Sequence, residues 1–270
     1  MATTSSTVRA QAVHLKEGGI SVSDLFVDAQ GSGEHVVLTH GSLATGSEEW
    51  EAQQPLAEEG FRLLVIDRRG YGRSPAAEGE DFQRDAEDIA VLMDGGAHLV
   101  GHSYGGLGVM LAAARRPEAT RSLAVLEPAA ITLGQDHQAA RDLTARMRAV
   151  WDLDLPDRAW MERFLEAVGS NPKELPPELL DAALPLVPVM RRGRLPADGD
   201  LPLAELASAT YPKLVVSGGH DPGFEAICDD LAEKIGASRS VIEGGGHEIQ
   251  FTGQPINDAL LSLWRGVPAA

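Results

Sequence analysis

Short runs rich in Val, Ile and Leu alternate along the chain with longer segments whose apolar residues recur at helical spacing. The strand-like runs cover residues 20–29, 35–41, 62–70, 97–103, 121–128, 213–221 and 239–245. Helix-like segments lie near residues 47–59, 81–93, 104–116, 222–235 and 254–265. This alternation predicts an α/β fold with a doubly wound, mostly parallel sheet of about eight strands. The first run alternates polar with apolar residues, which favours an antiparallel edge hairpin.

Residues 131–210 interrupt this alternation. They carry helix and proline signals with no strand-like run, and the strand pattern resumes at Tyr211. A separate domain is not favoured, because the late strands need the early ones as pairing partners. We therefore expect one core domain from residues 1–130 and 211–270, with residues 131–210 inserted as a helical cap.

Composition narrows the classes of partner. The chain has 270 residues, of which 43% are hydrophobic, enough for a large core. Its 23 Lys and Arg stand against 40 Asp and Glu, and a net charge of −17 repels nucleic acid and anionic membranes. No stretch reads as a signal peptide or membrane span, so we expect a soluble cytoplasmic protein.

The segment AHLVGHSYGGLGVML, residues 97–111, runs from a strand pattern through a serine into a helix pattern. Gly101-His102-Ser103-Tyr104-Gly105 fits the G-x-S-x-G elbow, in which small residues allow a tight strand-to-helix turn. Such a turn exposes the serine hydroxyl and places it at the positive end of the following helix. Ser103 is therefore the candidate nucleophile.

A serine hydroxyl needs a base within hydrogen-bond reach. His247 follows three glycines after the last strand-like run, and the expected order of serine, acid, histidine requires a late histidine. His40, His102 and His220 are interpreted as loop or packing residues.

Two acids compete for the third catalytic position. Asp221 ends a strand-like run, but the following Pro222 also fits a helix N-cap with proline at the first helical position. Glu127 ends the apolar run after the elbow helix, where a buried carboxylate without a basic partner would be costly. We favour Glu127 and keep Asp221 as the alternative.

Two backbone N–H groups are needed to bind an oxyanion. The first candidate is that of Tyr104, directly after the serine, and the second lies in the loop VVLTHGSLATG. Within that loop Ser42 is favoured over Leu43 as the donor.

Taken together, the motifs LTHGS, DRRGYGRS, GHSYGG, LEPA, SGGHDP and GGGH resemble the α/β-hydrolase fold superfamily over nearly the whole chain outside the cap. The resemblance implies Ser103 as nucleophile, His247 as base and the amides of Ser42 and Tyr104 as the oxyanion hole. LEPA is similar to the zearalenone-type lactonases, which take the acid from this strand, whereas GGHDP is similar to the commoner arrangement. The acid stays open between the two.

The expected activity is hydrolysis of a carboxylic ester or lactone without metal or cofactor, because no metal-ligand cluster or phosphate loop is found. Lyase or perhydrolase chemistry on the same residues, or a non-catalytic small-molecule receptor, are the alternatives. An apolar ester or lactone is the expected partner. Candidate substrate-binding residues are Leu43, Trp151, Trp160 and Met190.

Overall fold

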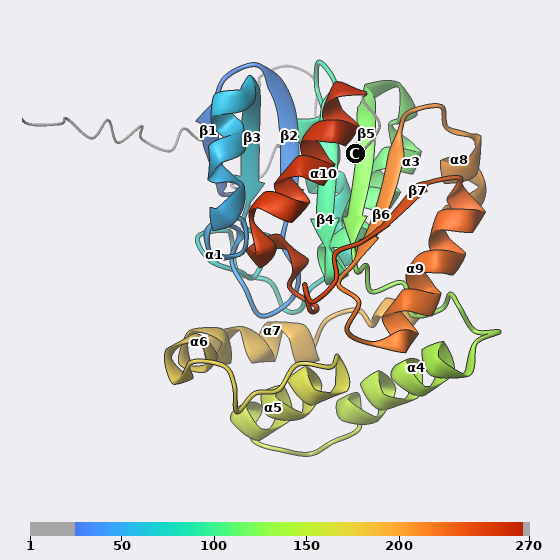
Figure 1. Cartoon of the computed structure of the whole chain (residues 1–270). Coiled ribbons are helices and arrows are strands. Elements are labelled where there is room, and N and C mark those ends of the chain that lie inside the picture. The colour runs from blue at the N-terminus through green and yellow to red at the C-terminus, as the bar shows by residue number, and fades with distance from the viewer. Residues whose placement is uncertain (1–24, 267–270) are drawn as a thin grey trace, which may run out of the picture.

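The computed structural model describes residues 25–266, and these form a seven-stranded sheet covered by helices (Figure 1). The strands are β1 (Val27–Gly31), β2 (Glu34–Thr39), β3 (Phe61–Ile66), β4 (Ala97–His102), β5 (Thr120–Leu126), β6 (Lys213–Ser217) and β7 (Ser238–Val241). Their order is β1-β3-β2-β4-β5-β6-β7, and only β1 is antiparallel to its neighbour. The predicted mostly parallel sheet is confirmed.

The α-helices are α1 (Gly46–Glu49), α2 (Phe82–Leu92), α3 (Ser103–Arg115), α4 (Gln138–Trp151), α5 (Asp157–Ala167), α6 (Pro177–Ala183), α7 (Val187–Arg191), α8 (Leu203–Ser208), α9 (Pro222–Ile235) and α10 (Gln254–Arg265). Five 3-10 helices accompany them: η1 (Glu51–Glu59), η2 (Pro117–Ala119), η3 (Leu184–Leu186), η4 (Pro196–Asp198) and η5 (Ile249–Thr252).

The sheet is buried on both faces, which explains why its strands read as continuous apolar runs. Successive residues of a strand point to opposite faces, so Val36 and Leu38 pack with η1 and α10, while Val37 packs with α2, α3 and α9. Two hydrophobic cores result, one on each side of the sheet.

The edge strand departs from the prediction in its pairing. We expected a hairpin, but β1 pairs with β3, which lies between β1 and β2. The connection passes the start of β3 so closely that a Cβ atom on Gly33 would lie 2.0 Å from the carbonyl oxygen of Gly60. Residues 20–24 of the predicted first strand lie outside the described residues.

Within residues 131–210 the described chain forms α4 to α8 and no strand. Figure 1 shows α4, α5, α6 and α7 as a layer beyond the end of the sheet toward which β4 and β5 point. By contrast, α8 packs against α3 and α9 beside the sheet. None of the described helices has the length and apolar character needed to span a membrane.

Candidate active site

The strand-to-helix elbow between β4 and α3 carries Ser103. The serine has φ 47°, a left-handed conformation that is costly for a residue with a side chain and that is found mainly at functional sites. Glycine is required beside it, because a Cβ atom on Gly105 would lie 2.4 Å from the carbonyl oxygen of His40. The elbow therefore brings α3 against the loop after β2 and leaves Ser103 only half-buried.

The imidazole of His247 connects Ser103 to Glu127. Its Nε2 lies 3.2 Å from Ser103 Oγ, and its Nδ1 lies 2.8 Å from Glu127 Oε2. An Nδ1–H group that donates to the carboxylate leaves Nε2 free to accept the serine proton. The three residues thus form one hydrogen-bonded series, although Ser103 and His247 lie 144 positions apart in the chain.

Glu127 lies at the end of β5 and is fully buried, with 0% of its surface exposed. Its Oε1 also accepts a hydrogen bond of 2.8 Å from the N–H of Gly218. Burial alone would raise the pKa of Glu127, but the neighbouring imidazoles of His220 and His247 outweigh burial and lower the pKa to about 2. Like Ser103, Glu127 has a left-handed φ, of 37°.

Asp221, the alternative acid, is engaged elsewhere. Its Oδ1 accepts a hydrogen bond from the N–H of Gly223 as the N-cap of α9, with Pro222 in the first turn. Its Oδ2 forms an ion pair of 2.6 Å with Arg146 of α4. The structure brings Glu127, and not Asp221, to His247.

The contact between His220 and Glu127 was not predicted from the sequence. Its Nδ1 lies 3.2 Å from Glu127 Oε1, so two imidazoles share one carboxylate. Such groups can also bind metals, and the ligand atoms of Glu127, His220 and His247 lie within 4.8 Å of one another. Here the carboxylate is at ion-pair distance from both rings, so its oxygens are already occupied by the imidazoles. Because β5 and β6 are neighbouring parallel strands, Glu127 after β5 and His220 after β6 lie close together. No local sequence motif indicates this proximity.

A second histidine, His102, supports the loop that carries His247. Its Nε2 lies 3.0 Å from the carbonyl oxygen of His247 and its Nδ1 lies 3.1 Å from Glu49 Oε1. Burial alone would lower the pKa of His102, but the charge of Glu49 outweighs it and raises the pKa. The same carboxylate accepts the N–H of Gly41, so Glu49 links the loop after β2 to the elbow.

The expected oxyanion donors belong to two segments next to Ser103, since a Cβ atom on Gly41, the residue before Ser42, would lie 3.1 Å from Ser103 Cβ. Tyr104 is in the first turn of α3, where backbone N–H groups have no partner within the helix. Ser42, in the loop after β2, turns its hydroxyl toward Glu80, with distances of 2.9 and 3.0 Å to the two carboxylate oxygens. The next residue, Leu43, has φ 65° and is half-buried.

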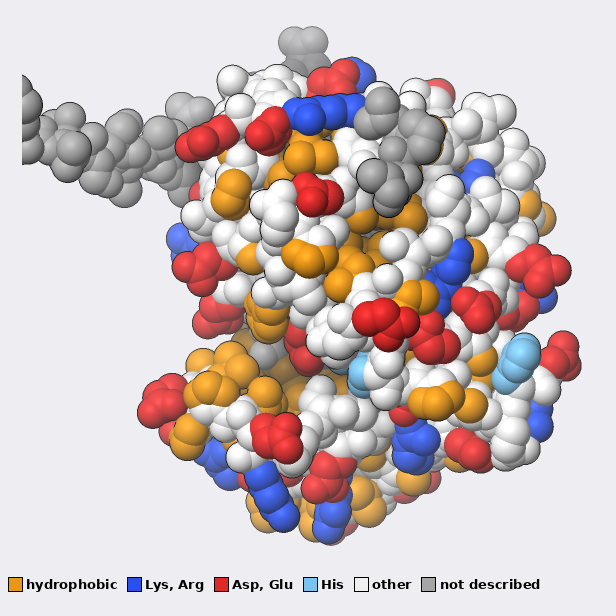
Figure 2. Space-filling view, in the orientation of Figure 1, with side chains coloured by type: hydrophobic (Ala, Val, Ile, Leu, Met, Phe, Trp, Pro, Cys, Tyr) orange, Lys and Arg blue, Asp and Glu red, His pale blue; other side chains and the backbone are white. Residues whose placement is uncertain are grey.

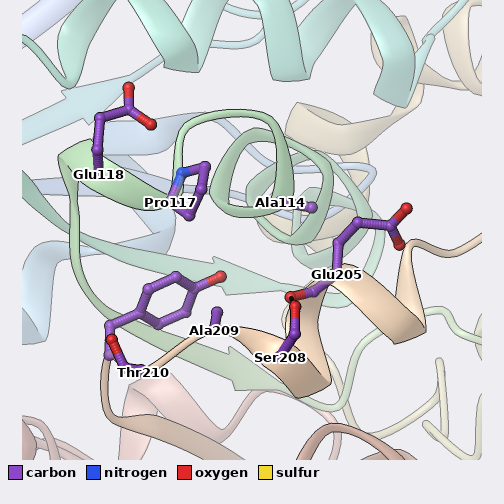
Figure 3. Close-up of a pocket in the computed structure, with 8 residues that line it drawn as sticks. Ala114, Pro117, Glu118, Glu205, Ser208, Ala209 and Thr210 are labelled. Atoms are coloured by element: carbon purple, nitrogen blue, oxygen red, sulfur yellow. Dashed lines mark hydrogen bonds between the residues drawn. The ribbon is translucent and has the colours of Figure 1, made fainter.

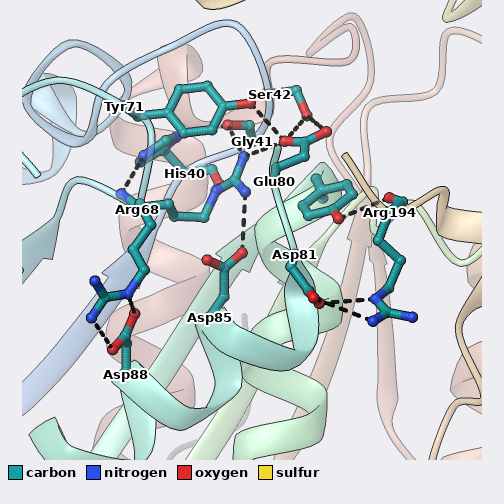
Figure 4. Close-up of polar contacts among 12 residues, drawn as sticks. His40, Gly41, Ser42, Arg68, Tyr71, Glu80, Asp81, Asp85, Asp88 and Arg194 are labelled. Atoms are coloured by element: carbon teal, nitrogen blue, oxygen red, sulfur yellow. Dashed lines mark hydrogen bonds and ion pairs between the residues drawn. The ribbon is translucent and has the colours of Figure 1, made fainter. Parts of the chain in front are cut away.

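A buried charge network fixes this loop (Figure 4). The guanidinium of Arg68 donates to the carbonyl oxygens of His40 and Gly41, each at 3.0 Å. It also pairs with Glu80 at 2.9 Å and with Asp85 at 3.1 Å, and all three side chains are at most 3% exposed. The positive group thus anchors the loop carbonyls while two carboxylates balance its charge.

Two of the candidate substrate-binding residues, Trp151 and Trp160, form part of a packed aromatic group. Trp160 is fully buried, donates its indole N–H to the carbonyl oxygen of Val150 at 2.8 Å and stacks on Phe164. Trp151 meets Trp160 edge to face and is only partly buried. Met190 is 3% exposed. Figure 2 shows a hollow between the sheet layer and the helices below it, lined with hydrophobic side chains.

A separate pocket of ≈ 450 Å³ lies between the end of α3, η2 and α8 (Figure 3). Ala114 lines it, eleven residues after Ser103 on the same helix, which corresponds to about 16 Å at 1.5 Å per residue. None of the candidate catalytic residues borders this pocket, so it is distinct from the site around Ser103.

Comparison with known proteins identifies the family of this chain. Residues 36–259 match the family model described as Alpha/beta hydrolase family. The chain belongs to the alpha/beta hydrolase family. Among solved structures, carboxylesterase CesB (YbfK) from Bacillus subtilis superposes with a TM-score of 0.69 at 21% identity, covering 97% of this chain and 94% of that one. At that identity the likeness shows the fold alone.

Two known proteins are similar to this chain over most of their length. The pimeloyl-(acyl-carrier protein) methyl ester esterase of Aeromonas salmonicida (strain A449) is 31% identical over 244 residues, covering 85% of this chain and 94% of that protein. The (E)-2-((N-methylformamido)methylene)succinate hydrolase of Acinetobacter baylyi (strain ATCC 33305 / BD413 / ADP1) is 26% identical, covering 88% and 93%. One is named an esterase and the other a hydrolase, which supports hydrolase activity for this chain.

Proposed function

We propose that the protein is a serine hydrolase that cleaves a carboxylic ester or lactone through an acyl-enzyme on Ser103. The observation that carries the proposal is the hydrogen-bonded series from Ser103 through His247 to the buried carboxylate of Glu127. A nucleophile, a base and a group that orients the base are the parts that acyl transfer requires. Membership of a hydrolase family and an esterase among the relatives support the same reaction.

In the first half of the reaction, Ser103 Oγ attacks the carbonyl carbon while His247 Nε2 takes the hydroxyl proton. The tetrahedral oxyanion accepts hydrogen bonds from the amides of Ser42 and Tyr104, each of which contributes about 3 kcal/mol to lowering the barrier. Glu127 stabilises the imidazolium of His247 and keeps Nδ1 protonated. His247 then protonates the leaving alkoxide as the C–O bond breaks.

The second half repeats these steps with water. His247 Nε2 takes a proton from a water molecule whose oxygen attacks the acyl carbon. The tetrahedral intermediate then collapses, the bond to Ser103 Oγ breaks, and His247 returns the proton to the serine. The products are a carboxylic acid and an alcohol, or a single hydroxy acid when the substrate is a lactone.

We propose that residues 131–210 act as a cap that selects the substrate. Leu43 and Trp151 are partly exposed and are the proposed contacts with the substrate, whereas the buried Trp160 and Met190 hold the wall of the site in shape. The apolar side chains of Leu43 and Trp151 favour an uncharged, apolar ester or lactone.

The proposal is tested by replacing Ser103 with Ala. We expect loss of hydrolysis of short p-nitrophenyl esters and loss of covalent labelling by a fluorophosphonate, with the fold intact by circular dichroism. Ser208→Ala, on the exposed face of α8, is the matched control and should keep both activities. Hydrolysis at the native rate by the Ser103→Ala protein would show that the assignment is wrong.

A further inference from the structure

His220 lies between the proposed catalytic acid and the helical segment. Its Nδ1 is 3.2 Å from Glu127 Oε1, and its Nε2 is 3.1 Å from the carbonyl oxygen of Val168 at the end of α5. The ring stacks on Phe224 with a centroid distance of 5.6 Å. Three elements, β5, α5 and α9, therefore fix its position, which is more than an ordinary turn residue requires.

Both ring nitrogens of His220 face oxygen acceptors, one a carboxylate and the other a carbonyl. A neutral imidazole can donate only one hydrogen bond, whereas an imidazolium donates two. Burial alone would lower the pKa of His220, but the neighbouring carboxylate of Glu127 outweighs burial and raises the pKa to about 9. The 3.2 Å contact of Nδ1 with a buried carboxylate therefore favours the imidazolium form of His220.

We propose that His220 is a positioning residue whose imidazolium holds Glu127 in place and balances part of its charge, so that His247 releases its proton more readily. The inference rests on the proposed function, because it assigns to His220 an effect on the proposed base. In a site with Glu127 alone, a protonated His247 would face an uncompensated anion. With His220 present it faces an ion pair, and its proton is held less tightly.

The nearest other charged group, Asp221, acts in the same direction as Glu127. It is paired with Arg146 of α4 at 2.6 Å, and its charge still helps to raise the pKa of His220. The His247 ring centroid is 6.1 Å from that of His220, and α5 and α9 present an uncharged carbonyl and the ring of Phe224. The charge of Glu127 is therefore shared between two imidazoles.

The experiment measures the second-order rate constant for fluorophosphonate labelling of Ser103 between pH 5 and pH 9. In His220→Gln the positive charge is gone, so we expect the acidic limb of the profile to move to higher pH by about 1 to 2 units. His220→Lys keeps a cation and should return the limb toward the wild-type position. His137→Gln, at an exposed histidine before α4, is the matched control and should leave the profile unchanged.

The inference is overturned if the acidic limb of His220→Gln stays within about 0.3 pH units of the wild-type limb. It is also overturned if the acidic limb of His220→Lys moves as far as that of His220→Gln. A merely structural role would lower the rate equally at every pH and move no limb. Should His220→Gln fail to fold, the ¹⁵N shifts of wild-type His220, assigned through its contact with Phe224, provide the test. A doubly protonated ring at pH 7 is expected, and a neutral ring overturns the inference.

These outcomes are distinguishable from failure of the proposed function. If the wild-type protein is not labelled on Ser103 and Ser103→Ala hydrolyses esters at the native rate, the proposed function fails and the inference fails with it. If labelling occurs and the limb does not move, only the role of His220 is wrong.

Discussion

Glu127→Gln removes one charge from the centre of the site without changing the size of the side chain. The amide can still accept from Gly218, but it offers His247 no negative charge to stabilise the imidazolium. It also allows the wrong tautomer, in which Nε2 carries the proton and cannot act as a base toward Ser103. The expected result is a fall in kcat with the fold retained.

The magnitude follows from two distances. Opposite unit charges at the 2.8 Å separation of His247 Nδ1 and Glu127 Oε2 interact by about 6 kcal/mol at an effective dielectric constant of about 20. On the same basis His220, with its ring centroid 6.1 Å from that of His247, repels the imidazolium by about 3 kcal/mol. Without Glu127, His220 more readily loses its proton, which removes that repulsion. The net loss is therefore about 3 to 6 kcal/mol, or about 10² to 10⁴ in kcat.

The assay is hydrolysis of p-nitrophenyl acetate at saturating substrate, with fluorophosphonate labelling as a second readout and circular dichroism as a check of folding. Asp221→Asn is the control, because Asp221 pairs with Arg146 and caps α9. It should keep kcat within about threefold and lose no more than about 1 kcal/mol of stability, because Asn can still cap α9 and only the ion pair with Arg146 is lost. The reasoning is refuted if Glu127→Gln keeps kcat within about tenfold of wild type, or if a folded Asp221→Asn protein shows the larger loss.

Two further predictions concern stability. Arg68→Met leaves Glu80 and Asp85 buried without their cation, so guanidinium unfolding at pH 7 should show a loss of about 3 to 5 kcal/mol in unfolding free energy. The control Arg163→Met, at an exposed position, should lose less than about 0.5 kcal/mol. Equal losses in the two variants would contradict the prediction. Because the pKa of His220 is raised from 6.5 to about 9, its stabilising contribution is complete below pH 6.5 and disappears as pH rises through 9. The wild-type protein should therefore be more stable than His220→Gln at low pH, and the difference in unfolding free energy should shrink as the pH rises over this range. The difference is at most about 3 kcal/mol, and less after solvent screening of the partly exposed ring. A difference that stays constant with pH would refute the prediction.

Local patterns along the chain sufficed to predict the fold and the elbow. The alternation of apolar runs and helix-like segments reflects strands buried on both faces and helices that cover them, and both are short-range periodicities. The G-x-S-x-G elbow is also local, since its glycines and Ser103 lie within five residues. The pairing of β1 was not predictable in the same way, because it depends on which distant strand completes the edge.

The arrangement around the acid was decided by tertiary structure. From the sequence, Glu127 and Asp221 both end strands, and His220 and His247 both follow glycines. Only the parallel pairing of β5 with β6 brings the residues after the two strands together, and only the packing of α4 supplies Arg146 as a partner for Asp221. Residue types and local spacing thus determine which groups are available for chemistry, whereas hydrogen bonds and ion pairs between residues far apart in the chain depend on how the strands are ordered in space.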